Sequence, residues 1–350
     1  MIESLGEANT AAIFGLIGGV LLGLAARLGR FCTLGAIEDL FYGGNDLRLR
    51  RWGVAIGVAV IGSFGLSAVG HFDMTQTIYV GLETTLIASA VGGLVFGYGM
   101  ALAGNCGYGA LARLGGGDLR NFVIVLVMGI ASYATISGPL AYARVWLFPT
   151  KVAESPSNIP SALSDASGIS ASTIGMAIGV TILLFTIAPA RIRQSPATIF
   201  WGAVVGLAIV SGWAGTSYLA AVGFDQTPVE SHTFSAPLGD AIFWWMTASG
   251  QTMNFAIGSV SGVWLGAFAG SLIKGHFRWE ACEDPRELRR QIIGAGLMGV
   301  GAVVAMGCSI GQGLSAASTL AWNAPVTMAA ILIGAAVGLR HLIAGFQPAD

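Results

Sequence analysis

The chain has 350 residues, of which 54% are hydrophobic and only 10% are charged, and its formal net charge is −1 at pH 7. Soluble domains carry about 25% charged residues, so a chain with this few charges cannot cover a water-facing surface and is expected to be an integral membrane protein. The sequence contains no G-x-x-x-x-G-K-[ST] pattern, which excludes a P-loop ATPase site in this chain, and nothing in it indicates nucleic-acid binding.

Nine hydrophobic runs are predicted to cross the lipid bilayer, because one span needs roughly 20 apolar residues. The first run is kept as a span, since the residues before it contain no Lys or Arg and so lack the basic region of a cleaved signal peptide. The 52 glycines fit helices that approach each other closely in lipid. In chain order the predicted spans are 10–28, 52–70, 83–104, 121–141, 171–190, 197–220, 251–273, 291–307 and 325–342.

Three Gly-rich breaks at the ends of predicted spans share a Cys-x-x-Gly pattern. They are "GRFCTLGAIE" with Cys32 and Gly35, "MALAGNCGYGALARLGG" with Cys106 and Gly109, and "MGCSIGQGLS" with Cys308 and Gly311. The third break continues as "CSIGQGLSAASTLAWN" without a charged residue, so it is predicted to dip back into the membrane as a short half-helix. A fourth break, at 221–248, has no cysteine, and Ser235 or Ala236 is expected to stand in its place.

The breaks occur in the same order twice along one membrane transport domain that covers 1–350. The predicted parts are a first repeat half at 8–141, an extracytoplasmic linker at 142–170, a connecting span at 171–195 and a second repeat half at 196–345. Because a single span connects the two copies, the second copy has the opposite orientation in the membrane from the first. The predicted fold class is therefore an all-α integral membrane protein with about nine transmembrane helices plus four short inward-pointing half-helices in two inverted pseudo-symmetric repeats.

The distribution of basic residues predicts the orientation of the chain. With the N-terminus outside, every Lys and Arg except Arg144 and Lys151 falls in an inner loop or at an inner span end. Because basic residues concentrate on the cytoplasmic side, the N-terminus is expected outside and the C-terminus in the cytoplasm. The Trp and Tyr residues near span ends are expected in the aromatic belts at the membrane surface.

The breaks form a candidate path for an anion. The three thiols would lie along it at different depths, together with the polar side chains of Asn105, Ser309 and Gln312. Half-helix N-termini present backbone N–H groups and a positive dipole end, which favour an anion. Arg30 and Arg113 would attract that anion at the inner side. The glycines expected to open the backbone at the breaks are Gly35, Gly104, Gly107, Gly109, Gly307 and Gly311.

A structural interpretation of the cysteines competes with the functional one. A free Cys usually behaves as a small buried hydrophobic residue, and a single Cys-x-x-Gly is a weak motif. Its repetition at three predicted breaks favours a functional role. Cys282 lies in a charged inner loop and is expected to be incidental.

The breaks "GRFCTLGAIED", "AGNCGYGALARLGGG" and "GCSIGQGLS", in this order, resemble the YeeE/YedE family of sulfur-compound transporters over roughly 10–342. The resemblance implies uptake of thiosulfate or a related sulfur oxyanion across the inner (plasma) membrane of a bacterium. It also implies that Cys32, Cys106 and Cys308 pass the anion inward through S–H contacts. Family members often work with a cytoplasmic sulfur carrier of the TusA type, so such a partner is expected. The loop 142–168 and the departure at 221–248 leave other sulfur or selenium species open as substrates.

Two other functions remain open at this stage. A membrane thiol oxidoreductase passing disulfides to quinone would need a Cys-x-x-Cys or two adjacent thiols, and a pore for neutral solutes would not need three cysteines. The chain is not expected to be an enzyme, and neither catalytic residues nor cofactors are predicted. No metal site is expected, because His71, His232, His276 and His341 lack metal-ligand spacing.

Overall fold

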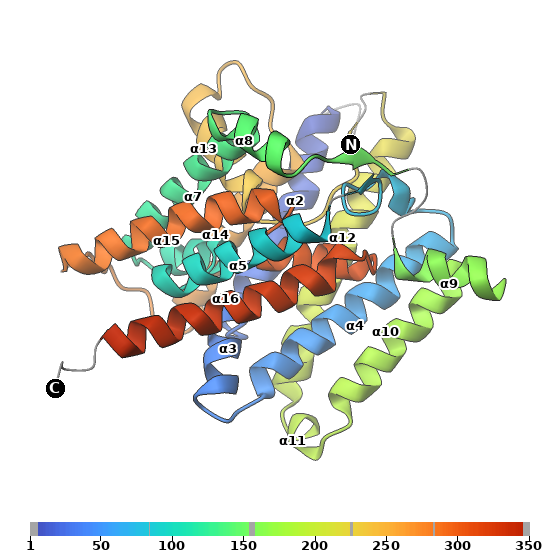
Figure 1. The fold of residues 1–350 in the computed structure, drawn as a ribbon, viewed down its shortest axis with the longest axis horizontal. Helices are drawn as coiled ribbons and strands as arrows, with labels where there is room; N and C mark the ends of the chain where they lie inside the picture. The colour runs from blue at the N-terminus through green and yellow to red at the C-terminus, as the bar shows by residue number, and fades with distance from the viewer. Residues whose placement is uncertain (1–5, 84, 154–157, 225–226, 283, 346–350) are drawn as a thin grey trace.

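The computed structural model describes residues 6–83, 85–153, 158–224, 227–282 and 284–345, most of which are helical. Long helices lie side by side in one bundle (Figure 1), and each predicted span coincides with one of them. They are α2 (Glu7–Arg27), α4 (Leu47–Ala68), α5 (Leu86–Ala103), α7 (Arg120–Ile136), α10 (Ala171–Ile187), α12 (Pro196–Val222), α14 (Phe255–Ile273), α15 (Pro285–Val304) and α16 (Asn323–Gly345).

Short helical segments follow the four predicted breaks. They are α3 (Thr33–Phe41), α6 (Gly107–Gly115), α13 (Ala236–Thr247) and the π-helix η2 (Gly311–Ala316), which lies within the helical residues 309–318. The remaining elements are short and belong to the connections. They are η1 (Met74–Gln76), α8 (Leu140–Leu147), α9 (Ile159–Ser167), α11 (Ala190–Arg193), and the antiparallel strands β1 (Leu82–Glu83) and β2 (Lys151–Val152), in which Leu82 pairs with Val152.

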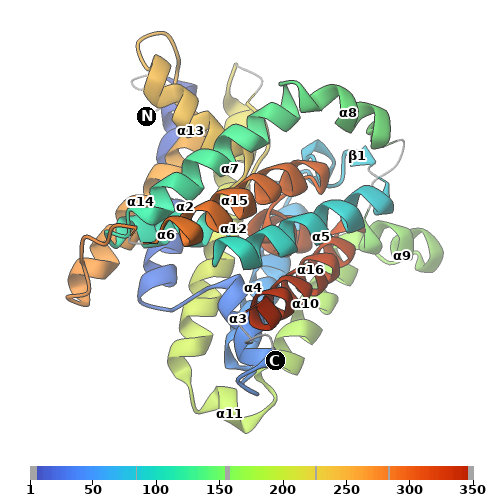
Figure 2. The same cartoon turned by 60° about the vertical axis from the view of Figure 1, so that its left-hand side comes forward.

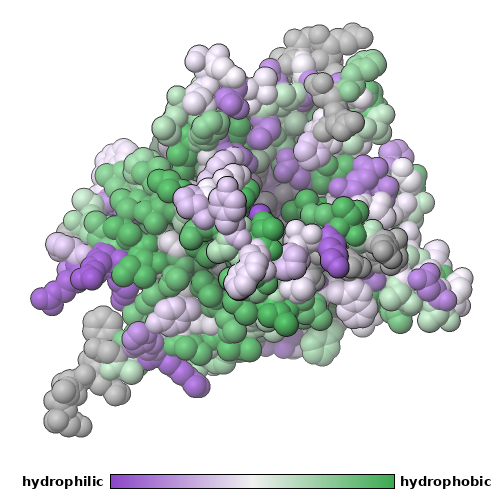
Figure 3. Space-filling model, turned by 45° about the horizontal axis from the view of Figure 1, so that its top comes forward, coloured by the Kyte–Doolittle hydropathy of each residue, from purple (hydrophilic) through white to green (hydrophobic). Residues whose placement is uncertain are grey.

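Six helices in the described residues are long and apolar enough to cross a membrane: α2, α4, α5 continued into α6, α12, α14 and α16. Helices α7 and α8 meet the same requirement only as a pair, which is bent by 59°, and α10 is apolar but has only 17 residues. Hydrophobic residues form a broad band across the face drawn in Figure 3. The prediction of a nearly all-α, multi-pass membrane protein is therefore confirmed.

Helices α4 and α15 extend furthest beyond the starts of their predicted spans. Helix α4 begins at Leu47 rather than at 52, and α15 begins at Pro285 rather than at 291. The Asp284 side chain accepts a hydrogen bond from the backbone N–H of Arg286, and a proline in the first turn already has the required φ. The added turns carry charged residues, so hydropathy alone detects only the apolar remainder of each helix.

Glycines allow several helix backbones to touch. A Cβ atom added to Gly19 of α2 would collide with the backbone of α14, and one added to Gly262 of α14 would collide with the backbone of α2. Gly99 of α5 and Gly294 of α15 oppose each other in the same way. Figures 1 and 2 show α5 lying between α15 and α16. These contacts confirm that the glycines serve close helix packing.

Candidate anion path

All three cysteines of the breaks lie directly before a short helical segment, and each sulfur accepts a backbone N–H from the residue three positions later. The N···S distances are 3.5 Å from Gly35 to Cys32, 3.4 Å from Gly109 to Cys106 and 3.5 Å from Gly311 to Cys308. This spacing is the one by which a capping side chain satisfies the first turn of a helix. The Cys-x-x-Gly pattern is therefore a helix N-cap, with a sulfur atom as the acceptor.

The glycine of each cap leaves room for a side chain from another segment. A Cβ on Gly35 would collide with the Arg48 side chain, and one on Gly311 would collide with the Thr233 side chain. At Gly109 the space is less restricted, since an added Cβ would lie 3.3 Å from Cβ of Asn105. The glycines therefore bring neighbouring side chains up to the capped turns.

The fourth break reaches the cysteine of the third. The backbone N–H of Phe234 donates to Sγ of Cys308 over 3.2 Å, and Oγ1 of Thr233 lies 3.6 Å from the same sulfur. Ser235, one of the two residues expected in place of a cysteine, occupies the N-cap position of α13, but its hydroxyl makes no cap hydrogen bond. Cys308 consequently holds together two breaks that lie far apart in the sequence.

Three breaks meet at Ser309. The Thr33 hydroxyl, at the start of α3, donates to Oγ of Ser309 over 3.1 Å, and both residues are buried. Cys106 interacts with the Ser309 side chain and is close enough to Cys32 and Cys308 to interact electrostatically with both. Thr33 was not predicted as a site residue, although a hydroxyl-bearing residue follows both Cys32 and Cys308 in the sequence.

Aromatic side chains surround the first two breaks. Phe31 stacks on Trp52 with ring centroids 4.8 Å apart, and Tyr108 packs against Phe234 at 5.4 Å. The Tyr108 hydroxyl donates to the carbonyl oxygen of Leu22 over 2.6 Å. Trp52 and Tyr108 are buried in the protein, so the expectation that Trp and Tyr near span ends lie in the membrane-surface belts is wrong for these two. Their position near a span end concealed their contact with neighbouring helices.

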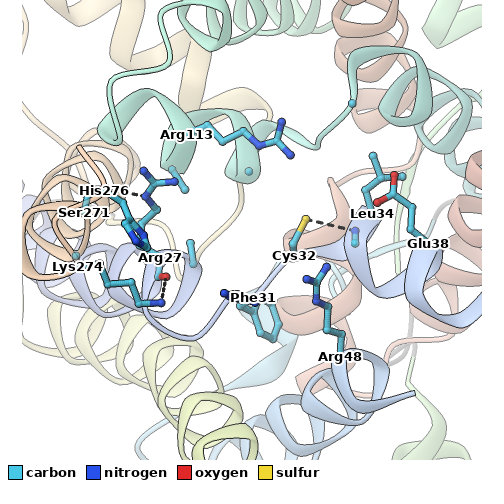
Figure 4. A pocket seen from close by; sticks show the side chains of 17 residues that line it. Arg27, Phe31, Cys32, Leu34, Glu38, Arg48, Arg113, Ser271, Lys274 and His276 are labelled. Atoms are coloured by element: carbon cyan, nitrogen blue, oxygen red, sulfur yellow. Dashed lines mark hydrogen bonds between the residues drawn. The ribbon is translucent and has the colours of Figure 1, made fainter. Parts of the chain in front are cut away.

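A cavity of about 380 Å³ lies beside Cys32. Figure 4 shows the Cys32 sulfur between the side chains of Arg113 and Arg48, with Arg27 and Lys274 on the other side of the view. Five basic residues and one acidic residue line the cavity: Arg27, Arg30, Arg48, Arg113, Lys274 and Glu38. We call the end of the bundle that carries this cavity the basic end. The predicted anion-attracting residues Arg30 and Arg113 are thus both present in it.

The basic side chains of the cavity differ in their partners. Arg48 forms an ion pair with Asp39 at 3.1 Å, Nε of Arg27 donates to Ser271, and Nζ of Lys274 donates to two carbonyl oxygens at the end of α2. Burial, together with the nearby charges of Arg30 and Arg27, lowers the pKa of Lys274. The guanidinium groups of Arg30 and Arg113 make neither a hydrogen bond nor an ion pair within the described part of the chain. Two cations are therefore available to a ligand.

A family model described as sulphur transport matches residues 28–337. The chain belongs to the sulphur transport family. This confirms the resemblance to the YeeE/YedE sulfur-compound transporters. Two relatives are named thiosulfate transporter TsuA. The one from Spirochaeta thermophila is 26% identical over 331 residues, covering 91% of this chain and 96% of the relative. The one from Escherichia coli is 24% identical over 344 residues, covering 91% of each chain.

Membership of the sulphur transport family also decides the class of activity. The family is described as sulphur transport, which is a transport class, and both relatives are named as transporters. The matched range contains all three cysteine breaks and every residue that lines the cavity except Ala26 and Arg27. All four cysteines are free thiols, and a disulfide-exchanging oxidoreductase gains no support from the structure.

Two side-chain amides were predicted to lie along the path, those of Asn105 and Gln312, and both donate hydrogen bonds to other parts of the chain. Nδ2 of Asn105 donates to the Asn121 side chain over 2.6 Å, and Nε2 of Gln312 donates to the carbonyl oxygen of Ala305 over 2.7 Å. Both residues are buried, and their amide oxygens have no partner among the described residues. Gln312 thereby ties η2 to the end of α15.

The other predicted glycines shape the second and third breaks. Gly104 has a φ of 78° and ends α5 in the left-handed conformation that glycine adopts readily. A Cβ on Gly107 would collide with the carbonyl oxygen of Phe234, so this glycine lets the second break approach the fourth. Gly307 directly precedes Cys308.

Proposed function

We propose that this protein takes up thiosulfate or a closely related sulfur oxyanion across the bacterial inner membrane. The observation that carries the proposal is the convergence of three cysteine-capped breaks at Ser309, with the fourth break bound to Cys308. The substrate class comes from the family and from the names of the two TsuA relatives. The anion would pass Cys308, then Cys106 with Ser309, and then Cys32, before it reaches the basic end.

The chemistry of the path suits a sulfur anion that must bind and leave again. Each short helix presents the N–H groups of its first turn, and these groups and the helix dipole favour negative charge. The thiols add weak S–H donors and polarisable sulfur atoms. No Lys or Arg contacts Cys106 or Cys308 within the described residues. An anion would therefore be held without a fixed opposite charge that could trap it.

We also propose nine membrane spans in two inverted repeats, with the halves, linker and connecting span at the predicted boundaries. Helix packing supports this arrangement, because the pairs match when the halves are exchanged. Exchanging the halves replaces α2 by α12, α4 by α14, α5 by α15 and α7 by α16. The pair α2–α14 then becomes α12–α4, and the pair α5–α16 becomes α15–α7, and all four pairs are packed together. The packed pairs α2–α12 and α5–α15 are unchanged by this exchange. Helix α10 packs closely on α4, and among the described residues no packing of similar extent joins α10 to α14, as expected for a connecting span.

The proposed orientation places the N-terminus outside and the basic end in the cytoplasm. A reporter that is active only in the cytoplasm should therefore work when it is fused after residue 350, and a reporter that requires the periplasm should not. Activity of a periplasmic reporter at this position would reverse the path and remove the positive-inside argument. At the basic end we propose that a TusA-type sulfur carrier, the partner implied by the family, accepts the anion.

Uptake of labelled thiosulfate by proteoliposomes tests the transport function directly. The parent protein should accumulate thiosulfate, and a variant with alanine at Cys32, Cys106 and Cys308 should not. Cys282→Ala is the matched control, since this thiol lies outside the proposed path and donates to the carbonyl oxygen of Asp284. Equal uptake by the triple variant and the parent would show that the thiols only pack the core.

A further inference from the structure

The cavity at the basic end recognises a different property of a ligand from the thiol path. The path offers sulfur atoms and backbone N–H groups, whereas the cavity offers the free guanidinium groups of Arg30 and Arg113. Guanidinium groups bind the oxygen atoms of planar or tetrahedral anions through paired N–H donors. Such groups select for charge and oxygen atoms, and they do not require a sulfur ligand.

The three other cations of the cavity are held in place before any ligand arrives. Arg27 and Lys274 are fixed by hydrogen bonds, and Arg48 is fixed by Asp39. Arg30 has a φ of 54°, a left-handed conformation that is uncommon for a residue other than glycine. The volume of about 380 Å³ is more than ten times the roughly 30 Å³ that one water molecule occupies in the liquid. The cavity therefore has room for a hydrated tetrahedral anion.

We propose that this cavity is a second oxyanion site, which binds tetrahedral inorganic oxyanions such as sulfate from the cytoplasm and slows thiosulfate uptake when it is occupied. The site itself rests on the geometry of the basic end, and only its effect on uptake rests on the proposed function. Sulfate and thiosulfate share three oxygen atoms on a tetrahedral sulfur and carry the same charge. A site with five basic side chains and the single carboxylate of Glu38 keeps an excess of positive charge and therefore binds both anions. A bound sulfate blocks and repels an anion that leaves the path beside Cys32.

Titration of the purified full-length protein with sodium sulfate at constant ionic strength tests the site, because salt alone screens such charges. The parent should bind sulfate, and the double variant Arg30→Gln/Arg113→Gln should bind it about tenfold or more weakly, since two charge-assisted contacts are lost. The matched control is Arg191→Gln/Arg193→Gln, which changes two exposed arginines of α11 that do not line the cavity. Failure of the parent to bind sulfate, or equal binding by the cavity variant, would overturn the proposal.

Right-side-out membrane vesicles test the effect on uptake. Vesicles loaded with sulfate should take up labelled thiosulfate several-fold more slowly than vesicles loaded with gluconate, for the parent and for the α11 control. The cavity variant should show the same rate under both conditions, even if that rate is lower than for the parent. An equal dependence on internal sulfate in the cavity variant would contradict the proposal.

The two proposals fail in different ways. Binding of sulfate should persist in the Cys106→Ala variant, which keeps every residue of the cavity. Sulfate binding without any thiosulfate uptake by the parent would overturn the proposed function and leave the site in place. Normal thiosulfate uptake without sulfate binding would overturn the site alone.

Discussion

Cys32 and Cys308 begin short helical segments in the same way, but their sulfur atoms lie in different surroundings. Cys32 is partly exposed, lines the cavity at the basic end and accepts one backbone N–H, from Gly35. Cys308 is 1% exposed and is contacted by donors from two breaks, including Phe234. The comparison teaches that one local motif serves two purposes: a thiol that a ligand can reach, and a thiol that joins two parts of the chain.

Cys106 lies between these two cases, and its replacement should have the largest effect on uptake. Cys106→Ala removes an S–H donor at the point where the breaks converge, beside Ser309. We expect thiosulfate uptake to fall about tenfold or more, as loss of an interaction of about 1.5 kcal/mol would produce. Initial rates in proteoliposomes measure this, with Cys282→Ala as the control that retains the parent rate. A parent-like rate for Cys106→Ala would remove this cysteine from the path.

Cys308→Ala should have the next largest effect on uptake and the largest effect on stability. It leaves the N–H groups of Phe234 and Gly311 without their sulfur acceptor in a buried site, at a cost of about 1–3 kcal/mol for each group that finds no other partner. Thermal unfolding in detergent should show a lower midpoint than for Cys32→Ala, whose sulfur accepts one N–H among the described residues. Cys308→Ser, which restores a smaller acceptor, should recover part of the loss. Equal midpoints for the alanine variants at Cys32 and Cys308 would contradict the joining role of Cys308.

Thr33→Val should have a smaller effect, because the side chain keeps its shape and only the hydroxyl that donates to Ser309 is lost. Removal of one hydrogen bond worth about 1 kcal/mol should slow uptake by about fivefold. The matched control is Thr181→Val, since this exposed threonine donates to the carbonyl oxygen of Ala177 within its own helix. An unchanged rate for Thr33→Val would show that the contact between the first and third breaks has no part in transport.

The least invasive test uses chemical labelling of the parent protein. A membrane-impermeant thiol reagent should label Cys32 and Cys282 from the side of the basic end, while Cys106 and Cys308 stay unlabelled because both are buried. Mass spectrometry of the digested protein identifies the modified residues. Thiosulfate should slow the labelling of Cys32 and leave Cys282 unaffected. Rapid modification of Cys308 would show that the two ends are equally open.

The helices and breaks could be predicted from the sequence because hydropathy and backbone chemistry act locally. Apolar runs marked every long helix, and the Gly-rich breaks marked the starts of the short ones. The capping role of the cysteines was also present in the spacing of Cys32 and Gly35, since three positions separate an N-cap from the N–H it binds. It escaped prediction because sulfur is not among the usual capping atoms, which are oxygens of Ser, Thr, Asp and Asn.

The contacts between breaks could not be predicted, because they depend on how the halves pack. Nothing local to Phe234 indicates that its N–H binds a sulfur 74 positions later in the chain. Cavity residues such as Lys274 were predicted as inner-loop charges, but their meeting beside Cys32 follows from the contact of α2 with α14. Only Thr33 offered a usable signal, because its place after Cys32 matches that of Ser309 after Cys308.

The glycine contacts between α2 and α14 have a consequence for how this chain can vary among strains and species. A methyl group on Gly23 of α2 would collide with the backbone of α14, and Gly23 lies one turn before Arg27, which lines the cavity. Exchanges to alanine, which are mild in most proteins, should therefore be harmful alleles along this contact. Bulky apolar exchanges on the lipid-facing sides should be nearly neutral. Natural variation should accordingly accumulate on the outside of the bundle and be purged where the helices touch.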